Sequence, residues 1–265
     1  MCINNDQKKK GCAVHKYMAS REMTVTQERW NALTVAPNPF FCFYYILAGH
    51  WVSQEAKSDI RVMEGFDESQ CIESQWFPSC TAMPPPAVLA IMVAIVVHAP
   101  FSFLYHWKYA HSVPPGLART THWSRRMDHA TIHLTGIFFS YATSGSLTYL
   151  LVNTLFNADC IYKQFEPKVI PRRNQSRVGI SVFAYTLPIL LRGEFSLYLS
   201  CLAVYATAGM LFIYYPIGGW SHSVFHLVLT LLPYIGMRVA STLPSSQPYM
   251  EVAAQCSMLA AGRRI

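Results

Sequence analysis

Long stretches without a charged residue most constrain what this chain can fold into. The longest covers 43 residues, Phe195–Met237, and others cover Ser74–Trp107, His129–Ala158 and Trp30–Gln54. Only 13% of the 265 residues are charged, whereas soluble domains have about 25%. A membrane-crossing helix needs about 20 mostly apolar residues, and the surface helices of soluble proteins carry charged outer faces, which these stretches lack. The sequence therefore predicts an all-α, multi-pass integral membrane protein.

Seven apolar segments predict a bundle of seven transmembrane helices, near residues 37–52, 86–107, 129–143, 145–163, 177–192, 195–215 and 222–241. The third and fourth share one apolar run, and a single helix over residues 129–158 would be about 45 Å long. Because the hydrocarbon core is about 30 Å thick, we expect a tight turn at Thr143–Ser146 that makes a helical hairpin. One overlong, tilted helix is the six-span alternative.

The positions of Lys and Arg predict the orientation of this bundle. With seven spans, fifteen of these residues lie on the side of the N-terminus and six on the other side. Cytosolic loops are enriched in positive charge, so the N-terminus should be cytosolic and the C-terminus outside. Six spans would move the basic loop near residues 160–177 outside, which the charge rule disfavours.

The predicted organisation is a polar, basic cytosolic tail over residues 1–36, the membrane domain over 37–243 and a short tail over 244–265. We expect no cleavable signal peptide, because no apolar run follows Met1. The lipid bilayer is the expected partner, and no nucleic-acid partner is expected. The acidic loop after the first span holds Cys71 and Cys80, which either form a disulfide on the outer side or remain free thiols.

Histidines carry the chemical signal of the sequence. His222 and His226 open the seventh span with an i, i+4 spacing that places both imidazoles on one helical face. His129 and His133 have the same spacing beside Asp128, so this second pair is a rival. Ionisable residues within a membrane are costly and mark functional sites, although the spacing alone favours hydrogen-bonded structural histidines over a metal site for either pair.

A zinc site needs at least one more protein ligand than a histidine pair provides. With seven spans, the second span ends on the side where the seventh begins, and His106 lies at that end. Asp128 opens the third span on the same side. Three histidines and a carboxylate therefore converge at one membrane face only in the seven-span arrangement.

Three ordered blocks resemble the hemolysin III family, relatives of the adiponectin and progestin receptors. Glu28–Thr34 (ERWNALT) is similar to the family's E-x-x-N-x-x-T-H before the first span, although Val35 replaces the final histidine. Ser102 and His106, followed by Arg125–Ile132 (RRMDHATI), resemble the second block. His222-x-x-x-His226 resembles the last, so the resemblance extends over residues 28–241.

The resemblance implies a seven-helix membrane fold with zinc bound by His106, His222 and His226 near the cytosolic face. It also implies that Asp128 hydrogen-bonds a water on the zinc and that Ser102 supports the site. It assigns His129 to the motif but not to the ligands.

Two function classes follow from this resemblance. One is a zinc-dependent hydrolase of ceramide-like lipid amides, in which Asp128 orients or deprotonates water. The other is a non-enzymatic receptor or structural membrane protein in which zinc only ties the helices together. Pore formation, which the family name suggests, is disfavoured because no amphipathic pore-lining pattern is present.

Overall fold

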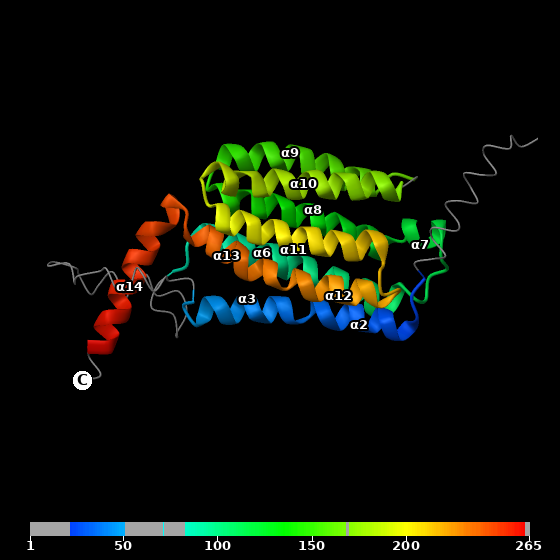
Figure 1. Ribbon diagram of the computed structural model, residues 1–265, viewed down its shortest axis with the longest axis horizontal. Helices are drawn as coiled ribbons and strands as arrows, with labels where there is room; N and C mark the ends of the chain where they lie inside the picture. The colour runs from blue at the N-terminus through cyan, green and yellow to red at the C-terminus, as the bar shows by residue number, and fades with distance from the viewer. Residues whose placement is uncertain (1–21, 51–70, 72–82, 168–169, 263–265) are drawn as a thin grey trace, which may run out of the picture.

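The computed structural model describes residues 22–50, 71, 83–167 and 170–262. All regular secondary structure in these residues is helical, and the longer helices run side by side in one bundle (Figure 1). The helices are α2 (Val25–Val35), α3 (Pro37–Leu47), α6 (Pro86–Leu104), the π-helix η1 (Tyr105–Tyr109), α7 (Leu117–Thr121), α8 (Trp123–Ser144), α9 (Leu147–Gln164), α10 (Pro171–Leu191), α11 (Phe195–Tyr214), α12 (Trp220–Leu229), α13 (Leu231–Ser241), the 3₁₀-helix η2 (Pro244–Ser246) and α14 (Gln247–Gly262).

Each of the seven predicted apolar segments contains a helix. Three helices are long and apolar enough to cross a membrane: Pro86–Tyr109, Phe195–Tyr214 and Trp220–Ser241. The first joins α6 to η1 and the last joins α12 to α13. The described part of the chain is thus all-helical and contains three helices that could cross a membrane.

Local signals explain where several of these helices begin. Thr24 caps α2 by accepting a hydrogen bond from the Gln27 amide at 3.3 Å, while the Gln27 side chain accepts one from the Thr24 amide at 2.9 Å. This reciprocal pair satisfies two amides that the first helical turn leaves without partners. Pro37, Pro86 and Pro171 begin α3, α6 and α10, where the missing amide proton costs nothing.

A tight turn separates α8 from α9, as predicted at Thr143–Ser146. Gly145 has a φ of 65°, and its amide donates to the Tyr141 carbonyl at 2.8 Å. Glycine adopts this left-handed conformation without the steric cost of a Cβ atom. Ser146 then caps α9 by accepting from the Tyr149 amide at 3.2 Å. The overlong single helix of the six-span alternative is therefore wrong.

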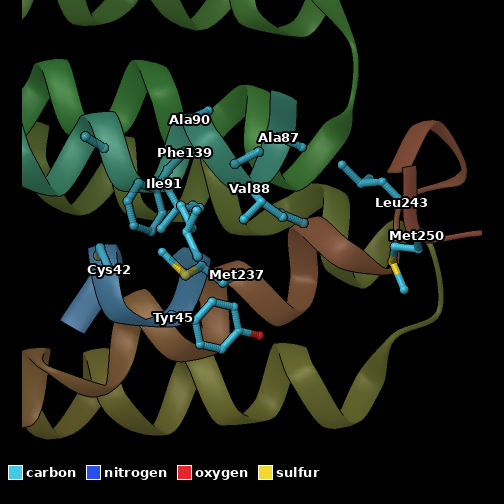
Figure 2. Close-up of a cluster of buried hydrophobic side chains, with 14 of the residues drawn as sticks. Cys42, Tyr45, Ala87, Val88, Ala90, Ile91, Phe139, Met237, Leu243 and Met250 are labelled. Atoms are coloured by element: carbon cyan, nitrogen blue, oxygen red, sulfur yellow. The ribbon is translucent and has the colours of Figure 1, made fainter. Parts of the chain in front are cut away.

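The main core lies between α3, α6, α8 and α13 (Figure 2). Tyr45, Ile91, Phe139 and Met237 come from these four helices in turn, and all four side chains are buried. Burying a large apolar side chain contributes about 1.5–3 kcal/mol in water, but membrane helices associate through close packing instead. This core lies in the half of the bundle away from η1 and α7. Buried polar side chains such as Glu28, His106 and Asp128 lie in the other half.

The structure overturns both alternatives for Cys71, a disulfide with Cys80 and a free thiol. Cys71 forms a disulfide with Cys256 on α14, 185 positions later in the chain. Cys80 lies outside the described residues. Figure 1 shows α14 at the end of the bundle opposite α7, so the disulfide lies at that end.

Two segments that the sequence suggested as tails contain helices. α2 occupies residues 25–35 of the expected N-terminal tail, and its Glu28 and Asn31 side chains are buried. α14 occupies most of the expected C-terminal tail. Glu28 matters for the site described below.

Candidate metal centre

Three histidines converge at the end of the bundle nearest η1. His222 and His226 lie one turn apart on α12, and His106 lies on η1. The Nε2 atoms of His222 and His106 are 3.3 Å apart, and those of His226 and His222 are 3.1 Å apart. All three residues are at most 8% exposed. The three histidines that the sequence predicted to converge therefore do so. Within the described residues, they form the one group of at least three potential metal ligands.

The π-helical turn gives His106 its position. In η1 the backbone bonds from residue i+5 to residue i, as in Ala110 N–H to the Tyr105 carbonyl at 2.8 Å. Such wide turns interrupt α-helices mainly at functional sites. The turn directly follows the apolar helix α6, so His106 lies where the apolar helix gives way to polar residues.

Glu28 of α2 holds His106 from behind. Its Oε2 atom lies 2.7 Å from His106 Nδ1, and Glu28 is only 2% exposed. An Nδ1–H donating to this carboxylate leaves the lone pair of Nε2 directed at the other two imidazoles. Metal-binding histidines usually have such a carboxylate partner, which fixes the tautomer and makes the ligand more basic.

Further hydrogen bonds hold Glu28 itself. Asn31 Nδ2 donates to Glu28 Oε2 at 3.2 Å, and Ser223 Oγ donates to Asn31 Oδ1 at 2.6 Å. Since Ser223 follows His222 directly, this chain of contacts joins α2 to the helix that carries the other two histidines. In the sequence, Glu28 and Asn31 stand out only as motif residues. Their i, i+3 spacing, which places them on one helical face, was the signal for a shared role.

The geometry of the trio fits a tetrahedral zinc ion. Nitrogen ligands at 2.0–2.1 Å from zinc are separated by about 3.3 Å in a tetrahedron. The two measured Nε2 separations, 3.3 and 3.1 Å, agree with this edge length. Three nitrogen ligands leave a fourth position for water or substrate, as in catalytic zinc sites.

Asp128 and Ser102 take different places around this cluster. Asp128, on the first turns of α8, is 6% exposed and lines the same cavity as His106 and His222. It does not belong to the cluster of potential ligands. Ser102 is buried on α6 one turn before His106 and does not border that cavity among the described residues. The arrangement brings Asp128 to the site and leaves Ser102 in the packing beneath it.

The rival pair has other partners. His129 Nδ1 lies 2.8 Å from Asn174 Nδ2 on α10, whereas His133 Nδ1 lies 3.0 Å from Asn157 Oδ1 on α9. Ser181 Oγ also donates to Asn157 Oδ1, at 2.8 Å. The two imidazoles thus join α8 to different helices and do not form part of a potential metal group in the described residues. His129 also lines the cavity that His106 and His222 border, whereas His133 does not.

A cavity of about 130 Å³ opens beside the histidines. It lies where α2, η1, α7 and α8 approach the ends of α9 to α12, and it exceeds by far the roughly 10–15 Å³ that one water needs. Its charged lining comprises Glu22, Glu28, Arg119, Arg125, Arg126 and Asp128. A small polar group can therefore lie beside the metal position.

Comparisons of this chain with protein-family models, with curated proteins and with solved structures found no match.

Proposed function

We propose that this chain is a multi-pass membrane protein of the hemolysin III type that holds zinc between His106, His222 and His226. We further propose that it hydrolyses the amide bond of a ceramide-like lipid. The observation that carries the proposal is the convergence of three buried imidazoles, with Nε2 separations of 3.3 and 3.1 Å in two of the three pairs and the Glu28 carboxylate behind His106.

The outer surface of the bundle supports seven crossings rather than three. On α9, the side chains of Leu147, Leu151, Val152 and Leu155 are 60–75% exposed. Similar exposed apolar residues follow on α10 and α11, among them Phe183 and Leu199. A soluble protein rarely exposes so large a continuous apolar surface, whereas lipid tails solvate it without cost.

The orientation we propose places the metal centre at the cytosolic face. The loops at the histidine end carry most of the Lys and Arg residues, as the charge rule requires for the cytosolic side. The Cys71–Cys256 disulfide lies at the opposite end, and disulfides persist in oxidising compartments. The two arguments are independent and agree.

Impermeant maleimide labelling checks this topology. In a chain with Cys2, Cys12 and Cys80 changed to Ser, we expect Ser112→Cys at the histidine end to react only after the cytosolic face is opened. Ser196→Cys at the other end should react in intact cells. Both serines are exposed in the structure. Labelling of both positions from the same face would contradict the seven-span arrangement.

The residues around the cavity suggest how the hydrolysis proceeds. Zinc, when bound, supplies a Lewis acid for a substrate carbonyl. Asp128 faces the cavity without serving as a ligand, so its carboxylate accepts the proton of the attacking water and then delivers it to the leaving amine. Glu28 keeps His106 in the tautomer that presents Nε2. The buried setting strengthens these electrostatic interactions.

A structural role for zinc is the second candidate. The three ligands come from two separate helices, η1 and α12, and Glu28 adds α2. An ion there would tie these elements together even without turnover. Measuring fatty-acid release from a panel of lipid amides distinguishes the hydrolase from the structural role. The zinc content of the purified protein is measured in parallel. Release above a zinc-only control supports the hydrolase, and bound zinc without release supports the structural role.

Glu28→Gln tests the carboxylate behind His106. The amide keeps the size of the side chain but removes the negative charge, so we expect zinc affinity to fall by about 10- to 100-fold. Competition with a zinc chelator measures this change. Glu251→Gln, at an exposed position on α14 outside the cavity, is the control and should bind zinc like the unaltered protein. Equal affinity for Glu28→Gln would remove Glu28 from the site.

A further inference from the structure

The arginines that line the cavity have no carboxylate partner. Within the described residues the ion pairs are His106–Glu28, Lys163–Asp159 and Arg192–Glu194, none of which involves Arg119, Arg125 or Arg126. Like charges that share a cavity repel one another, and partly buried guanidinium groups normally pair with an anion. Among the described residues, three guanidinium groups without an ion-pair partner therefore lie beside the metal position.

The carboxylates that share the cavity balance the three arginines in formal charge but form no ion pair with them in the described residues. Glu28 instead accepts a hydrogen bond from His106, and Glu22 is exposed to solvent. Asp128 lies within ion-pair distance of no arginine in the described part of the chain. A zinc ion at the histidines would add further positive charge to the same cavity.

The guanidinium groups of Arg119 and Arg125 have N–H donors without hydrogen-bond partners in the described residues. Arg119 uses Nε to bind the Val113 carbonyl at 3.0 Å, which fixes the plane of its guanidinium group and leaves both Nη atoms without a partner among the described residues. Arg125 makes no hydrogen bond there. Both side chains are partly buried and line the cavity. Fixed, planar donors of this kind match the oxygens of a phosphate group in pairs.

Arg126 lines the same cavity. Its Nη1 and Nη2 atoms donate to the backbone carbonyls of Phe165 and Glu166, each at 2.9 Å. These contacts anchor the side chain without neutralising it. Its Nε atom is buried and has no hydrogen-bond partner in the described residues. Arg126 thus adds positive charge to the cavity lining, while Arg119 and Arg125 offer guanidinium N–H groups that have no hydrogen-bond partner in the described residues.

We propose that Arg119 and Arg125 bind the phosphate group of a substrate whose scissile bond lies at the histidines. The chemistry that they recognise is a phosphate group whose negative charge is not offset by a cation in the same molecule, carried by a lipid headgroup or by a soluble molecule. If the phosphate belongs to a lipid, the proposal rests on the proposed function and narrows its substrates to lipid amides that carry a phosphate group. The cavity opens at the end where we place the membrane surface, so a headgroup reaches it from the bilayer.

Binding of short-chain phosphatidic acid, measured by titration calorimetry in detergent, tests the site. We expect saturable binding to the full-length protein and none of phosphatidylcholine with the same chains, because its choline group offsets the phosphate charge. Arg119→Gln/Arg125→Gln should weaken binding by at least tenfold. Arg173→Gln, at an exposed position on α10 outside the cavity, is the matched control and should bind normally.

A second arm distinguishes the source of the phosphate. Inorganic phosphate that binds as tightly as phosphatidic acid, with the same dependence on the two arginines, supports the anion site and assigns it to soluble phosphate compounds. Phosphatidic acid that binds much more tightly assigns it to lipid. If the double variant folds poorly, Arg125→Lys keeps the charge, loses the paired donors and should give a partial loss.

All titrations are repeated in a chelator, so that binding to zinc makes no contribution. Binding in the chelator that depends on the arginines supports the anion site even if the protein proves not to hydrolyse amides. Binding that is absent there, or unchanged in Arg119→Gln/Arg125→Gln, would overturn it and leave the zinc centre and its hydrolysis of uncharged amides untouched.

Discussion

The double variant His222→Ala/His226→Ala is expected to bind no zinc, whereas the unaltered protein binds one zinc per chain. Both imidazoles lie within 3.3 Å of a neighbouring imidazole nitrogen, so the variant removes two of the three ligands at once. His106 alone cannot retain an ion that needs at least three protein ligands. Elemental analysis of the purified proteins measures the result.

The rival histidine pair provides the matched control for this experiment. His129→Ala/His133→Ala removes two imidazoles with the same i, i+4 spacing, but their partners are Asn174 and Asn157. This control should keep its zinc and lose thermal stability. The reverse pattern, with zinc lost from the control and kept in His222→Ala/His226→Ala, would move the metal centre to α8.

Asp128→Asn is expected to keep zinc and to lose hydrolysis. The side chain lines the cavity and is not part of the ligand cluster, so the amide should leave the metal in place. Asparagine has nearly the same shape but cannot accept a proton from water. General base catalysis contributes about 100- to 10,000-fold, so we expect turnover of a ceramide-like amide to fall by at least about 100-fold.

The assay is fatty-acid release from lipid amides in detergent, at matched zinc content. Asp159→Asn on α9 is the control, because Asp159 is half exposed and pairs with Lys163 on the same helix. It should hydrolyse normally. Equal release by the unaltered protein and Asp128→Asn would end the role of Asp128, and a change in thermal stability alone would favour the structural role for zinc.

The features that depend on residues close together in the sequence could be predicted. The i, i+4 spacing placed His222 and His226 on one face, and the turn before Ser146 followed from glycine and from the length of the apolar run. His106 needed the added argument about which helix ends meet. The π-turn on which it lies has no spacing signal in the sequence.

The remaining features depend on contacts between distant segments. Glu28 was assigned to a polar tail because a charged residue before an apolar run looks the same whether it faces water or a buried histidine. His133 and His226 have equivalent patterns, and only their neighbours on other helices distinguish them: Asn157 of α9 for His133, and the ring of His106 on η1 for His226. Cys256 could not be chosen as the partner of Cys71 because spacing holds no information on pairing across so long a separation.

The Cys71–Cys256 bond closes a covalent ring that contains α6 to α13 and leaves α2 and α3 outside it. A protease cut anywhere inside the ring would leave one covalently joined molecule until the disulfide is reduced. A cut between α3 and Cys71 would instead release the segment that carries Glu28. After such a cut, only noncovalent contacts would keep the carboxylate behind His106, among them the Asn31–Ser223 hydrogen bond and the packing of α2 against α12. Among the groups that build the metal centre, Glu28 is therefore the one that can leave while every histidine stays attached.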